Sequence, residues 1–137
     1  MANSIFVDTS GFYASLVRRD DKHAEAAAFL AKGARGRKLF VTSDYILDET
    51  ATLLRARGHG HLIEPFLESV LSSRACSVEW MDPQRFLETR RYLARHSDKE
   101  WSFTDCFSFF LMQQAKLRRA LTKDEHFRQA GFTPLLT

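Results

Sequence analysis

The chain has 137 residues and a formal net charge of +3, from 20 lysines and arginines against 17 aspartates and glutamates. Its composition, 45% hydrophobic and 27% charged, is typical of globular proteins, and no segment approaches the roughly 18 uninterrupted apolar residues of a membrane span. The first residues carry no basic segment followed by an apolar one, so we expect no secretion signal. The two cysteines, Cys76 and Cys106, match no metal-ligand spacing and favour free thiols in a reducing compartment. We therefore expect a cytoplasmic protein with a single domain over 1–137.

Short strand patterns alternate with longer helical patterns along the chain. Strands are expected at 4–7, 38–42, 76–80, 119–122 and 133–136. Helices are expected at 10–19, 22–32, 43–57, 62–73, 82–96, 102–116 and 123–131. This alternation predicts an α/β fold in which helices flank a central, mostly parallel sheet of about five short strands. In such folds, functional sites form beyond the carboxyl ends of the strands.

Capping residues mark several of the expected helix boundaries. Ser43 and Asp82 stand where an N-cap is needed, and Pro83 occupies the first helical position after Asp82. Gly33 and Gly36 are expected to end the second helix, because glycine adopts the backbone conformation that commonly terminates helices.

Two aspartates follow strand patterns. Asp8 comes directly after the strand at 4–7, and Asp124 follows the strand at 119–122. Each has a purely structural interpretation as a helix N-cap, and each also stands where chemistry is expected. His126, two residues after Asp124, is interpreted as a surface or packing histidine.

Asp48 and Glu49 are neighbouring acids in the helix expected at 43–57. At about 100° per residue, Asp48 points almost opposite the apolar stripe, whereas Glu49 lies at its edge. The stripe consists of Ile46, Leu47, Thr50, Leu53 and Leu54. Asp48 is therefore expected to be an ordinary exposed acid, and Glu49 either faces a cleft or forms a boundary pair at the surface.

Asp105 lies in the segment "WSFTDCFSFFLMQQA", which is otherwise aromatic, aliphatic or small. With Ser102 as N-cap, Asp105 occupies the third helical position, which is the spacing of a capping box. Apolar residues cover the remaining faces of this helix, so a purely capping carboxylate would lack a solvated side. We expect Asp105 to face an internal cavity and to bind a metal ion while also helping to start its helix.

Several carboxylates held close together repel one another, and their pKa values rise unless a cation neutralises them. Oxygen-rich clusters suit Mg²⁺ or Mn²⁺, which bind substrate phosphate. A cation of this kind lowers the pKa of a bound water and stabilises charge on a phosphodiester. The acids therefore favour phosphodiester hydrolysis.

Basic residues are clustered along the chain. If four carboxylates gather in one cleft, the remaining surface carries 20 basic against 13 acidic residues, a net +7. Such a surface suits a polyanion held by its phosphates, although each cluster is also explained as a solvated helix face. The clusters are Arg35, Arg37 and Lys38; Arg55 and Arg57; Arg90, Arg91 and Arg95; and Lys116, Arg118 and Arg119. The candidates for binding RNA are Arg55, Arg57, Arg118 and Arg119.

Four motifs, in their order and spacing, resemble those of the PIN-domain ribonucleases, especially the VapC type of bacterial toxin. They are "FVDTSGFYA", "SDYILDETATLL", "SFTDCFSFFLM" and "ALTKDEHFRQAGF", and the resemblance spans essentially the whole chain. It implies a catalytic quartet made of Asp8, Glu49, Asp105 and Asp124. It further implies accessory roles for the hydroxyl residues Thr9, Ser10 and Thr104. Within the quartet, a metal ion is expected at Asp8, Asp105 and Asp124.

The resemblance also implies dependence on Mg²⁺ or Mn²⁺, endonucleolytic cleavage of RNA, a homodimer, and inhibition by an antitoxin whose tail enters the active-site groove. The alternative is a catalytically inactive PIN-fold module that binds RNA or protein, which the presence of all four acids disfavours. A phosphatase of α/β type is also disfavoured, because position 10 lacks the second aspartate of the D-x-D nucleophile motif.

Apolar residues between positions 43 and 73 predict self-association. They exceed what a helical hairpin on a small sheet needs to bury internally. They are Leu53, Leu54, Leu62, Phe66, Leu67 and Leu71.

Overall fold

The structure is a computed structural model that describes residues 4–35 and 39–137. Within these residues, five strands form one parallel sheet in the order β3-β2-β1-β4-β5. The strands are β1 (Ile5–Val7), β2 (Phe40–Ser43), β3 (Cys76–Glu79), β4 (Arg119–Leu121) and β5 (Thr133–Pro134). The expected α/β fold with a parallel sheet of short strands is confirmed.

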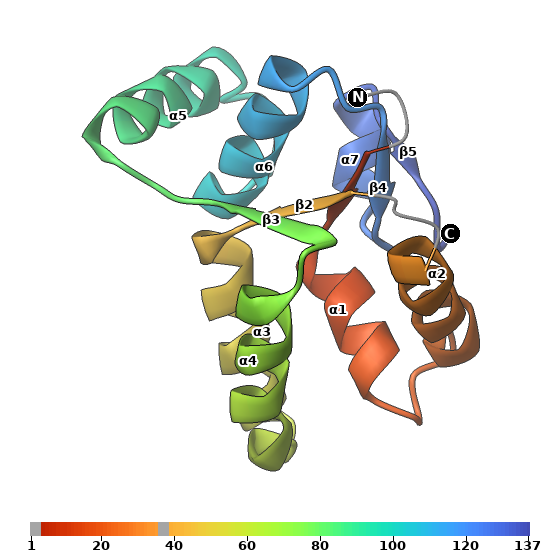
Figure 1. Cartoon of the computed structure of the whole chain (residues 1–137). Coiled ribbons are helices and arrows are strands. Elements are labelled where there is room, and N and C mark those ends of the chain that lie inside the picture. Colours follow the sequence, from red (N-terminus) through yellow and green to blue (C-terminus); the bar gives the residue numbers. More distant parts are fainter. Residues whose placement is uncertain (1–3, 36–38) are drawn as a thin grey trace.

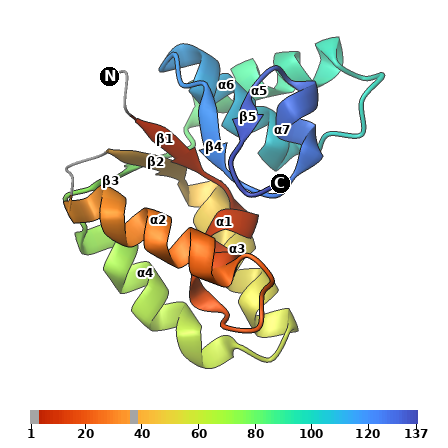
Figure 2. The same ribbon diagram turned by 90° about the vertical axis from the view of Figure 1, so that its right-hand side faces the viewer.

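Helices cover both faces of the sheet. They are α1 (Thr9–Leu16), α2 (His23–Arg35), α3 (Asp44–Ala56), α4 (Ile63–Ser72), α5 (Pro83–Arg95), α6 (Phe103–Gln114) and α7 (Glu125–Gln129), with a 3-10 turn η1 (Gly60–Leu62) before α4. Figures 1 and 2 show α1 to α4 on one side of the sheet and α5 and α6 on the other, with α7 beside β5. None of the helices in the described residues has the length and apolar composition needed to cross a membrane.

Most of the expected boundaries are correct within a few residues. The side chain of Ser43 accepts a hydrogen bond from the backbone N–H of Ile46, and Asp82 caps α5 in the same way, with Pro83 in its first turn. Gly33 does not end α2, which continues to Arg35 because Gly33 is buried against Phe40 and is needed there for close packing. Positions 36–38, which include the second expected helix stop, part of a basic cluster and the first residue of an expected strand, lie outside the described residues.

The centre of the sheet is almost entirely apolar. Every residue of β1 is buried, as expected for a central strand covered on both faces, and the flanking β2 is buried throughout. On the α6 side, Phe109 contacts the rings of Trp101, Phe127 and Phe132. Both cysteines are free thiols, as expected. This rigid core fixes the carboxyl edge of β2, β1 and β4.

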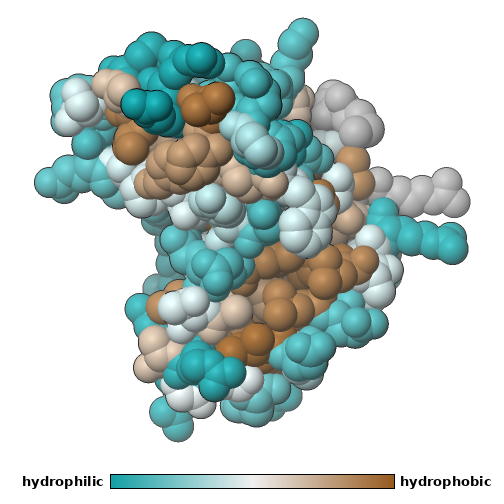
Figure 3. Space-filling model, turned by 90° about the vertical axis from the view of Figure 1, so that its left-hand side faces the viewer, coloured by the Kyte–Doolittle hydropathy of each residue, from teal (hydrophilic) through white to brown (hydrophobic). Residues whose placement is uncertain are grey.

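The apolar surface expected to drive self-association is smaller than the sequence suggests. Leu54 and Phe66 are buried in the core, and Leu53, Leu62 and Leu67 are half-buried against it. The large apolar side chains that are exposed in the described residues are Leu71, Trp80, Phe86 and Leu87. Figure 3 shows apolar side chains gathered on the face of the molecule formed by α3 and α4 below and α5 above. The helices were predicted correctly, but α4 buries more of these apolar side chains against α1 and α3 than expected.

Candidate active site

Asp8 lies where β1 gives way to α1, between the two strands that flank β1. Its backbone N–H donates to the carbonyl oxygen of Leu121, and its own carbonyl accepts the first hydrogen bonds of α1. The side chain is only 6% exposed, and its Oδ2 accepts a 2.8 Å hydrogen bond from the Thr122 hydroxyl. As an N-cap, Asp8 makes no side-chain capping bond. The carboxylate is therefore held toward the end of β4 instead of serving its helix.

A chain of hydroxyl groups links the ends of β1 and β4. Thr122 gives its single proton to Asp8, so Ser10, whose oxygen lies 3.0 Å from the Thr122 oxygen, must be the donor in that pair. Ser10 in turn accepts from the backbone N–H of Lys123 at 2.8 Å, and Thr122 accepts from that of Asp124 at 3.0 Å. These bonds orient Asp8 and connect the start of α1 to the segment that leads from β4 to Asp124.

Close backbone packing holds α1 against β4. A side chain on Gly11 would overlap the carbonyl oxygen of Leu121, the same oxygen that accepts from the Asp8 N–H. Glycine is required here for close approach, since any Cβ would separate the two segments. The geometry of the Asp8 carboxylate depends on this contact.

Glu49 lies in the second turn of α3, which follows β2. Its Oε1 accepts a 2.5 Å hydrogen bond from the Thr9 hydroxyl, so Thr9 connects Glu49 to the residue next to Asp8. Asp48, one residue earlier, is exposed, and its side chain makes no hydrogen bond within the described residues. Both residues are exposed, but Glu49 contacts the start of α1 through Thr9, which agrees with its position at the edge of the apolar stripe; its role in a cleft stays a prediction.

Asp105 combines capping with a second contact. Ser102 and Asp105 form the expected capping box: the Ser102 hydroxyl accepts from the Asp105 N–H, and Asp105 Oδ2 accepts from the Ser102 N–H at 3.1 Å. The same Oδ2 lies 3.0 Å from Nδ1 of His126. The side chain of Asp105 is 15% exposed. Asp105 therefore combines the expected capping role with a half-buried carboxylate that also contacts His126, and its place in a cavity stays a prediction.

Asp124 starts α7. Its Oδ1 accepts from the backbone N–H of His126 at 2.9 Å and lies 3.5 Å from the imidazole Nδ1 of the same residue. Ligand atoms of Asp105, Asp124 and His126 all lie within 4.8 Å of one another. Two acids far apart in the sequence thus meet at one histidine.

The four acids share one electrostatic environment. Burial raises the pKa of Asp8 to about 7, with smaller contributions from the charges of Glu49 and Asp105, while hydrogen bonds from Thr122 and the Thr9 backbone oppose the rise. Burial also raises the pKa values of Glu49 and Asp105, and the charge of Asp124 adds to both. Groups whose ionised forms are disfavoured by burial and by one another are the groups that a cation would stabilise.

The free carboxylate oxygens fit a hard cation. Within the described residues, Glu49 Oε2, Asp105 Oδ1 and Asp124 Oδ2 accept no hydrogen bond, because each acid uses its other oxygen for contacts with the protein. Within the described residues, the buried side-chain oxygen or nitrogen that has no hydrogen-bond partner is Ser4 Oγ. The free oxygens of Asp105 and Asp124 are not among such buried atoms, so they reach solvent. Oxygen donors of this kind suit Mg²⁺ or Mn²⁺.

Two contributors were missed from the sequence. Thr122 was treated as part of a strand end, and His126 as a surface or packing residue, yet both contact the acids directly. The usable signal for Thr122 was a hydroxyl side chain at a strand end, two residues before an acid. Thr9 and Ser10, which follow Asp8, are also hydroxyl residues within two positions of an acid.

The remaining candidates lie farther from the quartet. The Thr104 hydroxyl contacts none of the four acids within the described residues, and its carbonyl accepts from Ser108. Arg118 and Arg119 lie at the amino end of β4, opposite the edge that carries Thr122. Arg55 and Arg57 are at the end of α3. The Arg57 guanidinium lies over the ring of Tyr13 in α1, 5.0 Å from its centroid. A role in binding RNA stays a prediction for all four arginines.

Lys123 ties the active-site loop to the turn between α1 and α2. Its ammonium group lies 2.7 Å from Asp20 and 2.6 Å from Asp21. Hydrogen bonds to these two aspartates raise the pKa of Lys123. The cation beside Asp124 is therefore paired with the α1–α2 turn and is not directed at the quartet.

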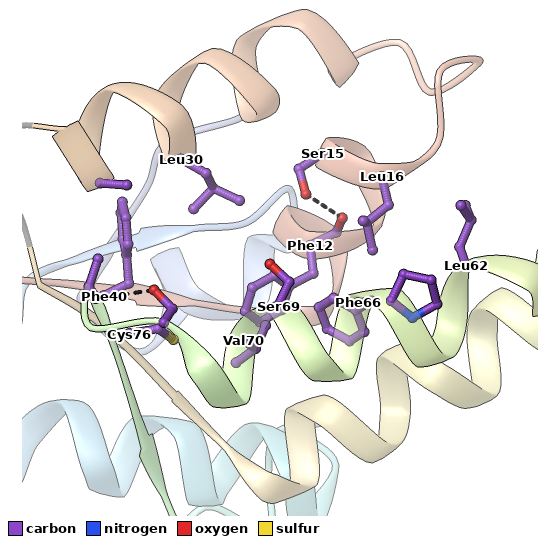
Figure 4. Close-up of a pocket in the computed structure, with 14 residues that line it drawn as sticks. Phe12, Ser15, Leu16, Leu30, Phe40, Leu62, Phe66, Ser69, Val70 and Cys76 are labelled. Carbon is purple, nitrogen blue, oxygen red and sulfur yellow. Dashed lines mark hydrogen bonds between the residues drawn. The ribbon is translucent and has the colours of Figure 1, made fainter.

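An apolar hollow that includes none of the four acids lies beside the later residues of α1. It has a volume of about 310 Å³ and is bordered by α1, α2, α4 and the adjoining strands. Figure 4 shows side chains of these elements pointing toward a common space, among them Phe12, Leu16, Leu30, Phe66 and Val70. The Ser15 hydroxyl at its border is satisfied by the carbonyl of Phe12. Among the described residues, those that border this apolar hollow include no cluster of ionisable groups.

Comparison with known proteins identifies the class. Residues 5–133 match the PIN domain, and the chain belongs to this family. It is 33% identical over 129 residues to the 23S rRNA-specific endonuclease VapC20 of Mycobacterium tuberculosis, covering 93% of this chain and 95% of that protein. The crystal structure of that sarcin-ricin loop cleaving toxin superposes with a TM-score of 0.84 at 30% identity, over 97% of this chain and 99% of that one.

A second solved structure shares the fold alone. PAE2754 from Pyrobaculum aerophilum superposes with a TM-score of 0.68 at 19% identity, over 98% of this chain and 91% of its own. The resemblance to VapC-type toxins drawn from the four motifs is confirmed by the family match and the VapC20 relative. The protein is therefore of the endoribonuclease toxin class.

Proposed function

We propose that the protein hydrolyses phosphodiester bonds in RNA with Mg²⁺ or Mn²⁺ held among Asp8, Asp105 and Asp124, and with Glu49 completing the catalytic quartet. The observation that carries this proposal is the carboxylate oxygen on both Asp105 and Asp124 that accepts no hydrogen bond, combined with the raised pKa of the buried Asp8. Such a cation supplies charge stabilisation at the phosphate and lowers the pKa of water.

The protein's own groups prepare this site. Thr122 and Ser10 orient Asp8, Thr9 binds Glu49 to the start of α1, and the capping box fixes Asp105 at the start of α6. Because the donors sit on helix ends and strand ends anchored in the core, the carboxylates are positioned before RNA arrives. Preorganisation of this kind lowers the cost of assembling charged groups around a reacting phosphate.

Ribosomal RNA is the first substrate class to test. The VapC20 relative is described as specific for 23S rRNA, and its similarity covers nearly the whole of both chains. Recognition of an exposed RNA loop requires contacts to phosphates and to unpaired bases. On this chain we propose that Arg55, Arg57, Arg118 and Arg119 contribute phosphate contacts, which predicts affinity that falls with salt.

We further propose that the protein works in the cytoplasm as a homodimer and is inhibited by an antitoxin. The exposed side chains of Leu71, Trp80, Phe86 and Leu87 offer apolar surface for a second copy. An antitoxin tail that entered the acidic groove would neutralise the quartet if it brought a cationic side chain. Light scattering at micromolar concentration tests the dimer: a monodisperse species near 15.8 kDa would exclude it.

Cleavage of a fluorogenic RNA with added Mn²⁺, and its loss in EDTA, tests the proposed activity. Glu49→Gln and Asp48→Asn form a matched pair, since both remove one charge from adjacent positions of α3. We expect Glu49→Gln to abolish cleavage and Asp48→Asn to leave it nearly unchanged. Binding of RNA without cleavage at any metal concentration would instead favour an inactive binding module, and equal losses in the two variants would exclude the assigned role of Glu49.

A further inference from the structure

His126 occupies a position between two of the proposed metal-binding acids. It lies in the first turn of α7, with its side chain 32% exposed. Its imidazole Nδ1 is 3.0 Å from Asp105 Oδ2 and 3.5 Å from Asp124 Oδ1, and its backbone N–H donates to that same Asp124 oxygen. One residue therefore contacts both carboxylates, from its ring and from its backbone.

The nitrogen facing the acids must carry a proton. Both oxygens within reach of Nδ1 belong to carboxylates, which accept hydrogen bonds when ionised, and an unprotonated nitrogen would place its lone pair against theirs. The 3.0 Å separation from Asp105 is a hydrogen-bond distance. In the neutral imidazole this selects the tautomer with hydrogen on Nδ1.

The bond from His126 determines which Asp105 oxygen is available. Asp105 Oδ2 accepts two hydrogen bonds, from the Ser102 N–H and from His126, whereas Oδ1 accepts none within the described residues. Two donors on one oxygen fix the rotation of the carboxylate about its Cβ–Cγ bond. The second oxygen is consequently held in one direction, open to the cleft.

The contact also links the first turn of α6 to α7, two helices that pack together through the rings of Phe109 and Phe127. Asp105 belongs to the first turn of α6 and His126 to α7, which arrives 21 residues later by way of β4. The capping box alone would orient Asp105 relative to α6, without reference to Asp124. His126 relates the two acids to each other.

We infer that His126 is a positioning residue that holds the Asp105 carboxylate for the cation through an Nδ1–H hydrogen bond, and that it is not itself a metal ligand. The inference rests on the proposed function. Nδ1, protonated and engaged with a carboxylate, has no lone pair for a metal, whereas Nε2 keeps one, and the substitutions below test whether a metal uses it. Partners of this kind orient ligating carboxylates, and their loss typically weakens metal binding about 10- to 100-fold.

Two amide substitutions separate positioning from ligation. The amide nitrogen of asparagine can occupy nearly the place of Nδ1, whereas that of glutamine extends toward the place of Nε2. We expect His126→Asn to bind Mn²⁺ with an affinity close to that of the wild type, and His126→Gln to bind it about 10-fold more weakly. Calorimetric titration of each purified protein with Mn²⁺ alone measures both, with circular dichroism to verify the fold.

The outcomes that overturn the inference are distinct. If His126→Asn loses as much affinity as His126→Gln, the imidazole lone pair is needed and His126 is a ligand. If both variants bind Mn²⁺ as the wild type does, His126 has no role in the metal site.

Nuclear magnetic resonance of the metal-free protein gives a readout that does not depend on the proposed function. At alkaline pH, where histidine is neutral, the ¹⁵N spectrum of His126 is expected to show the Nδ1–H tautomer. Asp105→Asn should shift that signal, while Asp48→Asn should not. A wild type that binds no Mn²⁺ would refute the metal site, yet the tautomer would still test the hydrogen bond; the opposite tautomer would refute the positioning role alone.

Discussion

The first turn of α1 and the rest of the helix have surroundings of opposite character. Thr9 and Ser10 contact residues of the acidic site, whereas Phe12 and Leu16 border the apolar hollow. What differs is the chemistry of the groups that burial affects.

Burial has different consequences in the two places. It raises the pKa of Asp8 to about 7 and that of the Cys76 thiol, at the border of the hollow, to about 11. The thiol is neutral at physiological pH with or without this shift, so burial costs it little. The carboxylate must be ionised to bind a cation, so burial of Asp8 opposes the stability of the metal-free protein. Burial therefore lowers the stability of the metal-free protein at Asp8 but has little effect on stability at Cys76.

The largest expected effect is on catalysis. Asp8→Asn and Asp105→Asn should each reduce RNA cleavage by about 100-fold or more, because a cation contributes several kcal/mol of transition-state stabilisation. Each variant is compared with the wild type in a single-turnover assay with saturating Mn²⁺. Retained cleavage in either variant would remove that residue from the proposed metal site.

Two glycine substitutions compare how easily the atoms beside the acidic site and those beside the hollow can move. The new Cβ of Gly11→Ala meets the backbone of β4 beside the site, whereas that of Gly33→Ala meets the Phe40 ring, which borders the hollow. A ring has space to move into the hollow, but a strand carbonyl does not. We expect Gly11→Ala to lower the free energy of unfolding by about 3 kcal/mol and Gly33→Ala by about 1 kcal/mol. Urea unfolding measures both, and equal losses would contradict the difference in rigidity.

The pH dependence of stability should reveal Asp8. Its pKa in the folded state, about 7, lies above its ordinary value of 3.8, so the stability it contributes is complete below about pH 4 and is lost as the pH rises through 7. Above pH 7 the metal-free Asp8→Asn variant should therefore be more stable than the wild type, by about 2 kcal/mol, and the advantage should disappear under acidic conditions.

Thermal unfolding in EDTA across this pH range provides the measurement. Asp48→Asn is the control, because Asp48 is exposed and its loss should not alter the pH profile. If Asp8→Asn is less stable than the wild type at every pH, the structural contribution of its hydrogen bond to Thr122 outweighs the cost of its charge.

The smallest effect is expected in the hollow. Ser69→Leu would add an apolar side chain to the hollow's border, where the Ser69 hydroxyl makes no hydrogen bond within the described residues. Burial of part of this side chain should stabilise the protein by about 1 kcal/mol. Cleavage should be unchanged, because none of the four acids borders the hollow. Reduced cleavage would show that the hollow and the acidic site are coupled.

Local patterns singled out the acids as candidates, each with a structural alternative, and the resemblance to PIN-domain ribonucleases joined them into one predicted quartet. Asp8 and Asp124 directly follow strands, and parallel strands bring such positions to one edge. Glu49 was separated from Asp48 by helical periodicity, and Asp105 by the absence of a polar face around it. None of these inferences required knowledge of the strand order, which the alternation of elements left open.

The partners of the acids could not be identified in the same way. Thr122 contacts Asp8 because β4 pairs with β1, and His126 contacts Asp105 because α7 returns beside α6. Both contacts depend on which distant segments meet. The same reason explains the overestimated apolar surface, since whether Leu54 and Phe66 are buried depends on how α3 and α4 pack against α1.

The pairing of β1 with β4 also fixes when the site can first exist during synthesis. The register joins Phe6 to Ala120 and Val7 to Leu121, two segments made at opposite ends of translation. A nascent chain that has emerged only as far as α6 carries three of the four acids, but the strand that orients Asp8 and precedes Asp124 is still absent. Domains fold as units once their last interacting segment is available. The nuclease is consequently inert for most of its own synthesis and becomes able to cleave RNA only after β4 and α7 have left the ribosome.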